Sequence, residues 1–278
     1  MDSSRYQELP AITAVLNYLI PTAEKPFNLT YDPPPGTART NTAYAGHPFA
    51  IHDARPIAGA LSLDREGFAL VRHETAIRDF DDEAALRSVY YPEAEALVAR
   101  VTGARRVLVF DHTIRRRFPH TQDRTAGLPR QPVPRVHNDY TVKSGPQRVR
   151  DLLGDEADDL LSRRFAIVNV WRPIRGPLLD TPLAVADARS VPFSDFIPSD
   201  LVYPDRRGET YAVAFNPAHR WFYVPAMRQD EALLIKCYDS AEDDRARFSP
   251  HSAFEDPTTP EDALPRESIE LRTLAFFA

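Results

Sequence analysis

Cysteine and long apolar runs are nearly absent from this sequence. Cys237 is the only cysteine among the 278 residues, which excludes an internal disulfide and a cysteine-rich zinc site. No apolar stretch approaches the roughly 18 residues that suggest a membrane span, and the first residues do not resemble a secretory signal. We therefore expect a cytoplasmic protein in a reducing compartment, with no membrane as a partner.

An excess of basic residues is also missing. The chain has 34 Lys and Arg against 40 Asp and Glu, a formal net charge of -6, and the two signs are interspersed rather than blocked. A surface that binds nucleic acid needs a basic patch or stripe. The composition therefore predicts no nucleic-acid partner.

Glycine is scarce and proline is abundant, with 10 Gly against 26 Pro along the chain. This balance favours many short elements joined by rigid turns. Seven short runs rich in β-branched and aromatic residues predict strands, mostly in the second half of the chain. They are residues 106–110, 165–171, 183–187, 210–215, 221–224, 232–238 and 268–277. Seven such runs predict a mainly β fold with two packed sheets.

Two stretches predict flanking α-helices. Residues 81–101 and 145–165 carry apolar side chains at the spacing of one helix face. Pro92 lies inside the first stretch and is expected to split or kink it.

The triplet His137-Asn138-Asp139 carries the clearest chemical signal. In an extended backbone, residues two apart project to the same side, so His137 and Asp139 can bind one ion while Asn138 points away. Such a triplet is also common by chance. The alternative is a His and an Asp at a strand end that bond only backbone groups.

A third ligand would come from a histidine further along the chain. His251 is separated from Arg266 by a short connector, whereas His219 lies among aromatic residues, which also suits a packed histidine or a wall that stacks on substrate. Either one would complete two imidazoles and one carboxylate. This ligand set, with open coordination positions, is typical of non-haem Fe(II) oxygenases.

Arg266 and Ser268 have the spacing of an anion anchor. A diacid that chelates iron through one end needs its distal carboxylate held about one strand away. A guanidinium binds a carboxylate through two hydrogen bonds, and a hydroxyl two residues along a strand points the same way. The alternative for Arg266 is an ordinary surface arginine at a strand end.

Longer strings around these residues resemble a known family. His137-Asn138-Asp139, His251 and Arg266-Glu267-Ser268 look like the HxD…H…RxS pattern of the iron(II)/2-oxoglutarate-dependent oxygenases. More specifically, four strings are similar to the hydroxylase/desaturase group typified by CmcJ and AsaB, with NvfI-like endoperoxide-forming enzymes nearby. The strings are residues 136–141 (VHNDYT), 169–174 (NVWRPI), 236–240 (KCYDS) and 250–257 (PHSAFEDP). The similarity runs from about Tyr44 to Arg272.

The resemblance implies a fold and a domain organisation. The fold would be mainly β with flanking α-helices and a double-stranded β-helix core, the cupin-like jelly roll. The chain would be a single oxygenase domain, in which residues 1–105 form an N-terminal cap and flanking elements and residues 106–278 form the jelly-roll core.

The resemblance also implies a site and a reaction. His137, Asp139 and His251 would bind Fe(II), and Arg266 and Ser268 would bind the carboxylate of 2-oxoglutarate, although Arg266 follows the distal His at a longer interval than in the most compact members. With O₂ as the second co-substrate, the enzyme would oxidise an unactivated C–H bond of a small molecule by hydroxylation, desaturation or oxidative cyclisation, in secondary metabolism. For the oligomeric state, we consider a homodimer.

Several residues are candidates for substrate contact. Asn169 and Trp171 share one face of a predicted strand, and Arg172 at its end could meet an anionic group of the substrate or could instead cap a loop carbonyl. Tyr140 and His219 are further candidates with equally plain structural alternatives.

Two other classes of protein fit parts of the pattern. A zinc-dependent hydrolase could use the same ligands with a water in the open position, but it would have no use for Arg266 and Ser268. A non-catalytic jelly-roll binding protein could use the aromatic residues at 221–223 as a ligand wall, but it would leave the three metal-ligand residues unexplained.

Overall fold

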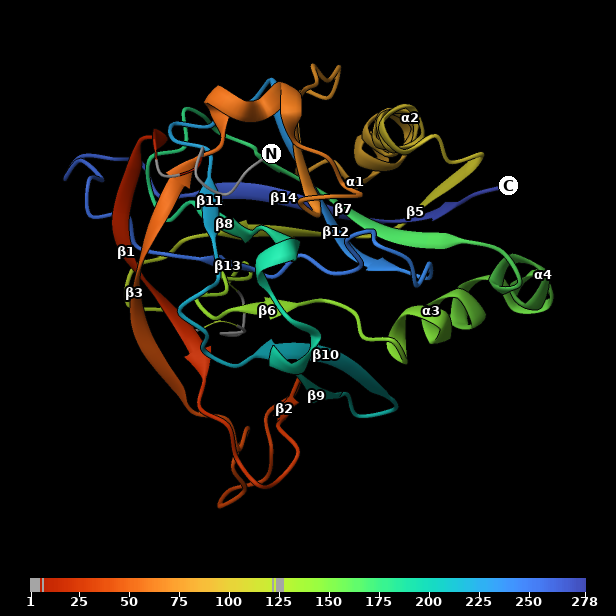
Figure 1. The fold of residues 1–278 in the computed structure, drawn as a ribbon, viewed down its shortest axis with the longest axis horizontal. Coiled ribbons are helices and arrows are strands. Elements are labelled where there is room, and N and C mark those ends of the chain that lie inside the picture. Colours follow the sequence, from red (N-terminus) through yellow and green to blue (C-terminus); the bar gives the residue numbers. More distant parts are fainter. Residues whose placement is uncertain (1–5, 7, 122, 124–127) are drawn as a thin grey trace.

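Two β-sheets face each other and form a jelly roll, with helices on the outside of one sheet and at one end (Figure 1). The computed structural model describes residue 6, residues 8–121, residue 123 and residues 128–278. The mainly β fold with flanking helices is therefore confirmed, and so are all seven predicted strands.

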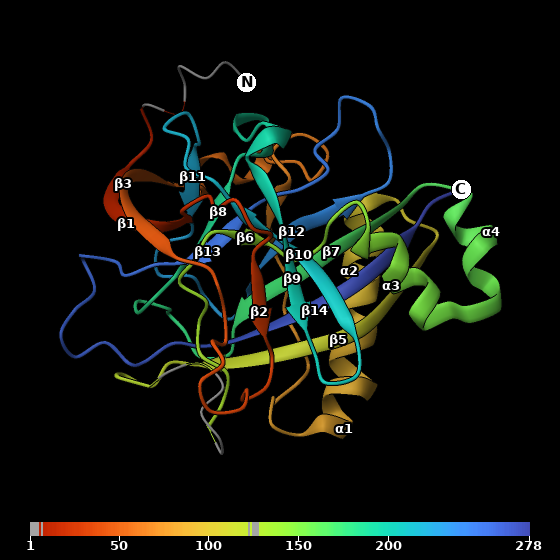
Figure 2. The ribbon, with the colours of Figure 1, turned by 90° about the horizontal axis from the view of Figure 1, so that it is seen from below.

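The larger sheet contains nine strands within the described residues. In spatial order they are β1 (Ala11–Leu19), β3 (Tyr44–Asp53), β11 (Trp221–Tyr223), β8 (Leu183–Ala186), β13 (His251–Ala253), β6 (His137–Asn138), β10 (Arg207–Val213), β9 (Phe196–Val202) and β2 (Phe27–Leu29). Figure 2 shows β2 beside β9, its parallel partner, on the side of the molecule that carries the candidate site.

The smaller sheet contains five strands of the described chain. Their order is β4 (Phe68–Arg72), β12 (Glu231–Asp239), β7 (Phe165–Pro173), β14 (Glu267–Phe276) and β5 (Arg106–Arg116). Every residue of β7 is buried, because one face meets the larger sheet and the other is covered by a helix.

The helical segments are mostly short. They are η2 (Arg55–Ala60), α1 (Glu83–Ala85), η3 (Leu86–Tyr90), α2 (Tyr91–Thr102), α3 (Ser144–Leu153), η4 (Gly154–Glu156), α4 (Ala157–Leu161), η5 (Ala188–Ser190) and η6 (Phe193–Asp195). None of the helices in the described ranges is long and apolar enough to cross a membrane.

Successive side chains of β14 point alternately to the outer and the inner face of the smaller sheet. Ile269 and Leu271 belong to the apolar cluster that includes Leu97 and Val98 of α2, on the outer face. Arg272 projects inward and reaches Asp139. The polar face of this strand therefore points into the barrel, because it lines a site rather than the solvent.

The two predicted helices are present with different internal breaks. In the first, Pro92 lies in the first turn of α2, directly after the π-helical turn η3, which matches the predicted split. The prediction of one helix over residues 145–165 is wrong at its end. Gly154 takes a left-handed φ of 48° where α3 stops, and Phe165 begins β7.

The N-terminal third contributes more to the sheets than its sequence indicated. Strands β1 and β3 pair along their whole length and extend the larger sheet, and β4 pairs with β12 in the smaller one. The division of the chain at residue 105 stays a prediction. Both sheets nevertheless contain strands from either side of that position.

Candidate active site

Three predicted ligand residues meet at the centre of the larger sheet. His137 lies on β6 with Asp139 just after it, and His251 begins β13 directly opposite His137 in the strand register. One donor atom from each lies within 4.8 Å of the others. Nε2 of His137 is 3.6 Å from Oδ1 of Asp139, and the two imidazole centroids are 4.5 Å apart.

Backbone carbonyls orient both imidazoles. Nδ1 of His137 lies 2.8 Å from the carbonyl oxygen of Arg135, and Nδ1 of His251 lies 3.2 Å from that of Ser249. A carbonyl only accepts, so each Nδ1 must carry the proton and donate it. Nε2 of each ring is then left with a lone pair, as a metal ligand requires.

The carboxylate of Asp139 is held in the same way. Its Oδ2 accepts a hydrogen bond of 2.9 Å from Nδ2 of Asn169 and one of 3.2 Å from Nε of Arg272. Oδ1 faces the imidazole of His137. Two donors on one oxygen fix the carboxylate and leave the other oxygen for an ion.

The charges of the site favour metal binding. Burial and then repulsion from His251 lower the pKa of His137 to about 3, so this ring is neutral at neutral pH. Burial raises the pKa of Asp139, but the charge of Arg272 and the hydrogen bond from Asn169 lower it, and the pKa is held well below its usual range. A neutral imidazole and an ionised carboxylate are the forms that bind a cation. The donor set fits Fe(II).

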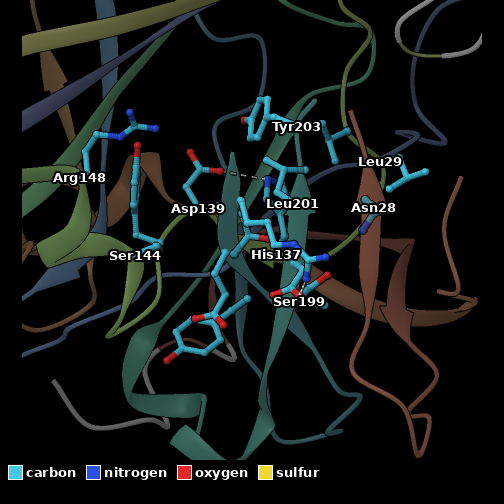
Figure 3. A pocket seen from close by; sticks show the side chains of 18 of the residues that line it. Asn28, Leu29, His137, Asp139, Ser144, Arg148, Ser199, Leu201 and Tyr203 are labelled. Carbon is cyan, nitrogen blue, oxygen red and sulfur yellow. Dashed lines mark ion pairs between the residues drawn. The ribbon is translucent and has the colours of Figure 1, made fainter. Parts of the chain in front are cut away.

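A cavity of about 560 Å³ opens beside these residues. Its wall includes His137, Asp139 and Arg272 near the ligand group and the residues of β2, β9, β10 and α3 further out. In Figure 3, Ser144 and Arg148 of α3 lie on one side of Asp139, and Leu29, Leu201 and Tyr203 lie on the other. The volume suits an organic molecule of moderate size.

Two arginines, Arg115 and Arg266, are candidates for binding an anion. Arg115 of β5 lines the cavity, and Arg266, just before β14, is 2% exposed and lies behind the wall. In the described part of the chain neither makes an ion pair. Burial and then repulsion from Arg115 lower the pKa of Arg266 to about 9, and burial lowers that of Arg115 to about 10. An anion beside these groups would stabilise their charged forms.

The predicted partner Ser268 lies beside Arg266. Its Oγ accepts a hydrogen bond of 2.9 Å from Nε of Arg266, and Nη1 of Arg266 donates to the carbonyl oxygen of Thr181. Among the described residues, Nη2 of Arg266 has no hydrogen-bond partner. The Ser268 hydroxyl also keeps its own proton to donate. The guanidinium stacks on Trp171, with 5.0 Å from Cζ to the ring centroid.

The remaining candidates from the sequence divide into two groups. Asn169 and Trp171 point into the barrel as predicted, and Tyr140 lines the cavity. Arg172 does not face the site. It pairs in register with Ile269 on the outer face of the smaller sheet, where it donates to the carbonyl oxygen of His73 and lies over the ring of Tyr90.

His219 lies outside the ligand group. Its Nδ1 is 2.9 Å from the hydroxyl of Tyr18, and its Nε2 is 3.0 Å from Oδ2 of Asp195. Both ring nitrogens are therefore occupied in a buried network that joins β1 to η6. The structure supports the interpretation of a packed histidine and gives His219 no place as the third ligand.

Three residues that line the cavity were not identified from the sequence. Thr113 and Arg115 alternate on β5, and Arg272 lies on β14 one strand away. Polar residues at a spacing of two in an otherwise apolar strand were the available signal. That signal could not be told from a solvent-facing strand before the fold showed which face was inside.

Two opposed sheets with an open 2-His-1-carboxylate group between them define a jelly-roll metal oxygenase. The family model described as "Oxidoreductase/YMDC permease-like domain" matches residues 16–276. Among curated proteins, the hydroxylase/desaturase efuI of Hormonema carpetanum is 34% identical over 96% of both chains. The Fe(II)/2-oxoglutarate-dependent dioxygenase nvfI of Aspergillus novofumigatus is 36% identical over 88% of both chains.

A solved structure agrees with these relatives. The iron and α-ketoglutarate-dependent endoperoxidase NvfI superposes with a TM-score of 0.87 at 32% identity, over 96% of this chain and 98% of that one. The chain therefore belongs to the Fe(II)/2-oxoglutarate-dependent dioxygenases of the hydroxylase/desaturase type. It is an enzyme that uses Fe(II), 2-oxoglutarate and O₂ on small molecules, and the zinc hydrolase and the non-catalytic binding protein are set aside.

Proposed function

We propose that His137, Asp139 and His251 bind the Fe(II) of this enzyme, and that the chain oxidises an unactivated C–H bond of a small molecule of secondary metabolism. The observation that carries this proposal is the convergence of one donor atom from each of the three residues within 4.8 Å. All three are oriented by a second partner, through Arg135, Ser249, Asn169 and Arg272.

We further propose that Arg266, Arg115 and Ser268 hold the distal carboxylate of 2-oxoglutarate. Burial lowers the pKa of both guanidinium groups although Glu270 lies near enough to raise it, and a carboxylate would stabilise their charged forms. Nη2 of Arg266 and the Ser268 hydroxyl are the donors left for it. This extends the anchor predicted from the sequence by one residue, Arg115.

When bound, Fe(II) would activate O₂, which is the oxidant of the C–H bond, and 2-oxoglutarate would supply the electrons that the C–H bond does not. The protein supplies position. Asn169 and Arg272 keep Oδ2 of Asp139 occupied, which would leave Oδ1 as the oxygen for a bound metal ion. Tyr140 and the residues of α3, β2 and β9 form the cavity in which the substrate is oriented.

The iron assignment is tested by adding Fe(II) and then 2-oxoglutarate to the purified protein without oxygen. We expect one Fe(II) per chain and a visible metal-to-ligand charge-transfer band, followed by succinate when oxygen is admitted. The variant His251→Ala should lose the band. A band of full intensity in that variant would remove His251 from the ligand set.

The anchor is tested by the variants Arg266→Ala and Arg115→Ala. Each should keep its iron and lose roughly 2–5 kcal/mol of 2-oxoglutarate binding, because a charged and desolvated contact is removed. Arg150 of α3 is exposed and does not line the cavity, so Arg150→Ala is the matched control. An unchanged 2-oxoglutarate requirement in Arg266→Ala, with a large rise in Arg115→Ala, would move the anchor to Arg115.

A further inference from the structure

The wall of the cavity carries more positive charge than its own carboxylates neutralise. Basic side chains outnumber acidic ones there by ten to six. Five of the six carboxylates are already in ion pairs with cavity cations, and the sixth, Asp151, accepts a hydrogen bond from Gln147. The cavity cations without an acidic partner in the described chain are Arg115, Arg135, Lys143, Arg148 and Arg206. Arg115 is assigned above to 2-oxoglutarate, which leaves four.

Arg148 is the best fixed of these four cations. It lies on α3, whose Gly145 touches the ring of Tyr238 so closely that an added Cβ would come within 2.8 Å of it. Val149 of the same helix is fully buried. The guanidinium lies over the ring of Phe110, with 5.7 Å from Cζ to the centroid. The charge is therefore held in place before any ligand arrives.

Tyr140 supplies a hydroxyl near this guanidinium. Its ring is 7% exposed and packs edge-on against Phe110, the same ring that Arg148 covers. No hydrogen-bond partner of the hydroxyl lies among the described residues, and Tyr140 lines the cavity. Arg148 and Tyr140 therefore bring a guanidinium and a phenol hydroxyl to the wall of the same cavity, where both can donate hydrogen bonds to an oxyanion.

Two leucines line the opposite side of the cavity. Leu29 and Leu201 lie on paired strands there, and Tyr203 presents its ring beside them (Figure 3). Asp139 lies between these residues and Arg148 in the same view, and the guanidinium of Arg206 lies over the ring of Tyr203, with 4.0 Å from Cζ to the centroid. A ligand that reached both sides would pass the metal-ligand group.

We propose that the substrate is an organic acid with an apolar body, and that Arg148 and the Tyr140 hydroxyl bind its acidic group. This assignment rests on the proposed function, because it names the substrate class of the same cavity. The acid is distinct from 2-oxoglutarate, whose anchor lies on β5 and β14 rather than on α3. Arg148 and Tyr140 then determine which end of the substrate is turned away from the metal.

The test uses 2-naphthoic acid and its methyl ester as probes, with binding to the full chain measured by equilibrium dialysis. The acid should bind the wild-type protein more tightly than the ester. In Arg148→Gln its dissociation constant should rise about tenfold, the effect of one charge-assisted hydrogen bond. Arg148→Lys should recover part of the loss. Arg150→Gln, on the same helix but outside the cavity, should behave as wild type.

A separate measurement distinguishes this proposal from the one above. The affinity for 2-oxoglutarate, followed through the charge-transfer band, should not change in Arg148→Gln. Equal binding of acid and ester by the wild-type protein, or an equal loss in Arg150→Gln, would overturn the substrate assignment. Loss of the band in the wild-type protein would overturn the iron assignment instead, and the dialysis result would be unaffected by it.

Discussion

Asn169 illustrates how much of this site is determined by residues that do not bind the metal. Its amide nitrogen is one of two donors on Oδ2 of Asp139, and it projects from the middle of a fully buried strand. Its Oδ1 is buried with no hydrogen-bond partner among the described residues. A buried polar group without a partner is costly to the folded state.

We expect Asn169→Ala to weaken Fe(II) binding roughly 10-fold to 100-fold, as is typical when a group that orients a metal ligand is lost. The reason is that Asp139 would keep one donor, Arg272, and could rotate. The measurement is an anaerobic Fe(II) titration. Ser268→Ala is the control, since it should leave iron binding intact and weaken 2-oxoglutarate binding. Identical iron affinity in Asn169→Ala would show that Arg272 alone orients the carboxylate.

The two downstream histidines provide a second test of single residues. His251→Ala should abolish stoichiometric iron binding, because His251 contributes one of the three converging donor atoms. His219→Ala should keep the iron and lose about 1–3 kcal/mol of stability, since the hydroxyl of Tyr18 and the carboxylate of Asp195 would lose a buried partner. Iron per folded chain and urea denaturation of both variants measure this. Iron loss in His219→Ala alone would reverse the assignment.

Among the secondary-structure elements, α3 places the cavity wall. Its position depends on a contact that only glycine allows, Gly145 against the ring of Tyr238 on β12. The loop before it is tied down by Thr141, whose Oγ1 accepts from the backbone nitrogens of Lys143 and Ser144. The helix is therefore fixed at its first turn to both the segment that follows His137 and Asp139 and the smaller sheet.

Gly145→Ala should destabilise the protein by about 1–3 kcal/mol, the usual cost of overpacking. The added Cβ would lie 2.8 Å from Cδ2 of Tyr238, so either the ring or the helix must shift. Gly59→Ala is the matched control, because a Cβ added there would have nothing within 4 Å of it. Urea denaturation of both variants is the measurement. Equal urea midpoints for the two variants would mean that the Tyr238 ring moves aside without a loss of stability.

Strand length alone did not decide which elements could be predicted from the sequence, because β3 has ten residues and was not predicted whereas β11 has three and was. The seven longer apolar runs carried enough residues to show a β pattern, and each is a strand. Strands β6 and β13 have two and three residues, and β2 has three, so no periodicity exists to detect. Strand β1 is long and alternates, so its pattern was visible in the sequence although the strand was not predicted.

Site residues could be predicted where residue type, family resemblance or strand alternation identified them. His137, Asp139 and His251 were identified by residue type and by family resemblance, and the fold brings them together. The face that Arg172 occupies follows from strand alternation, since Asn169 and Trp171 point inward and the residue after Trp171 must point outward. Arg115 could not be identified, because its role depends on a neighbour, Arg266, that is distant in sequence.

At the scale of the whole molecule, the two faces of the smaller sheet have separate tasks. The outer face packs against α2 through one apolar cluster, whereas the inner face carries charged groups beside a second apolar cluster that includes Ile167 and Trp171. The charged groups of the site therefore occupy only part of the inner face, and apolar side chains pack on both sides of the same strands. Substitutions of Ile269 or Leu271 should therefore change stability without changing the site directly.

Histidines that lose solvent contact on folding make the stability of the iron-free protein sensitive to acid. Burial is the largest cause that lowers the pKa of His52, His73 and His219 below the ordinary value of 6.5. Below pH 6.5 the unfolded chain binds protons at these sites that the folded chain does not. The stability that they contribute is therefore present above pH 6.5 and is lost as the pH falls toward their folded-state values.

We expect the urea midpoint of the iron-free protein to fall steadily between pH 7 and pH 5. The carboxylates with lowered pKa values, such as Asp64 and Asp239, titrate below this window in both states and do not oppose the trend. His52→Gln removes one of the three groups and should make the dependence shallower. A midpoint that stays constant or rises as the pH is lowered from 7 to 5 would show that these histidines are protonated in the folded protein, contrary to their burial.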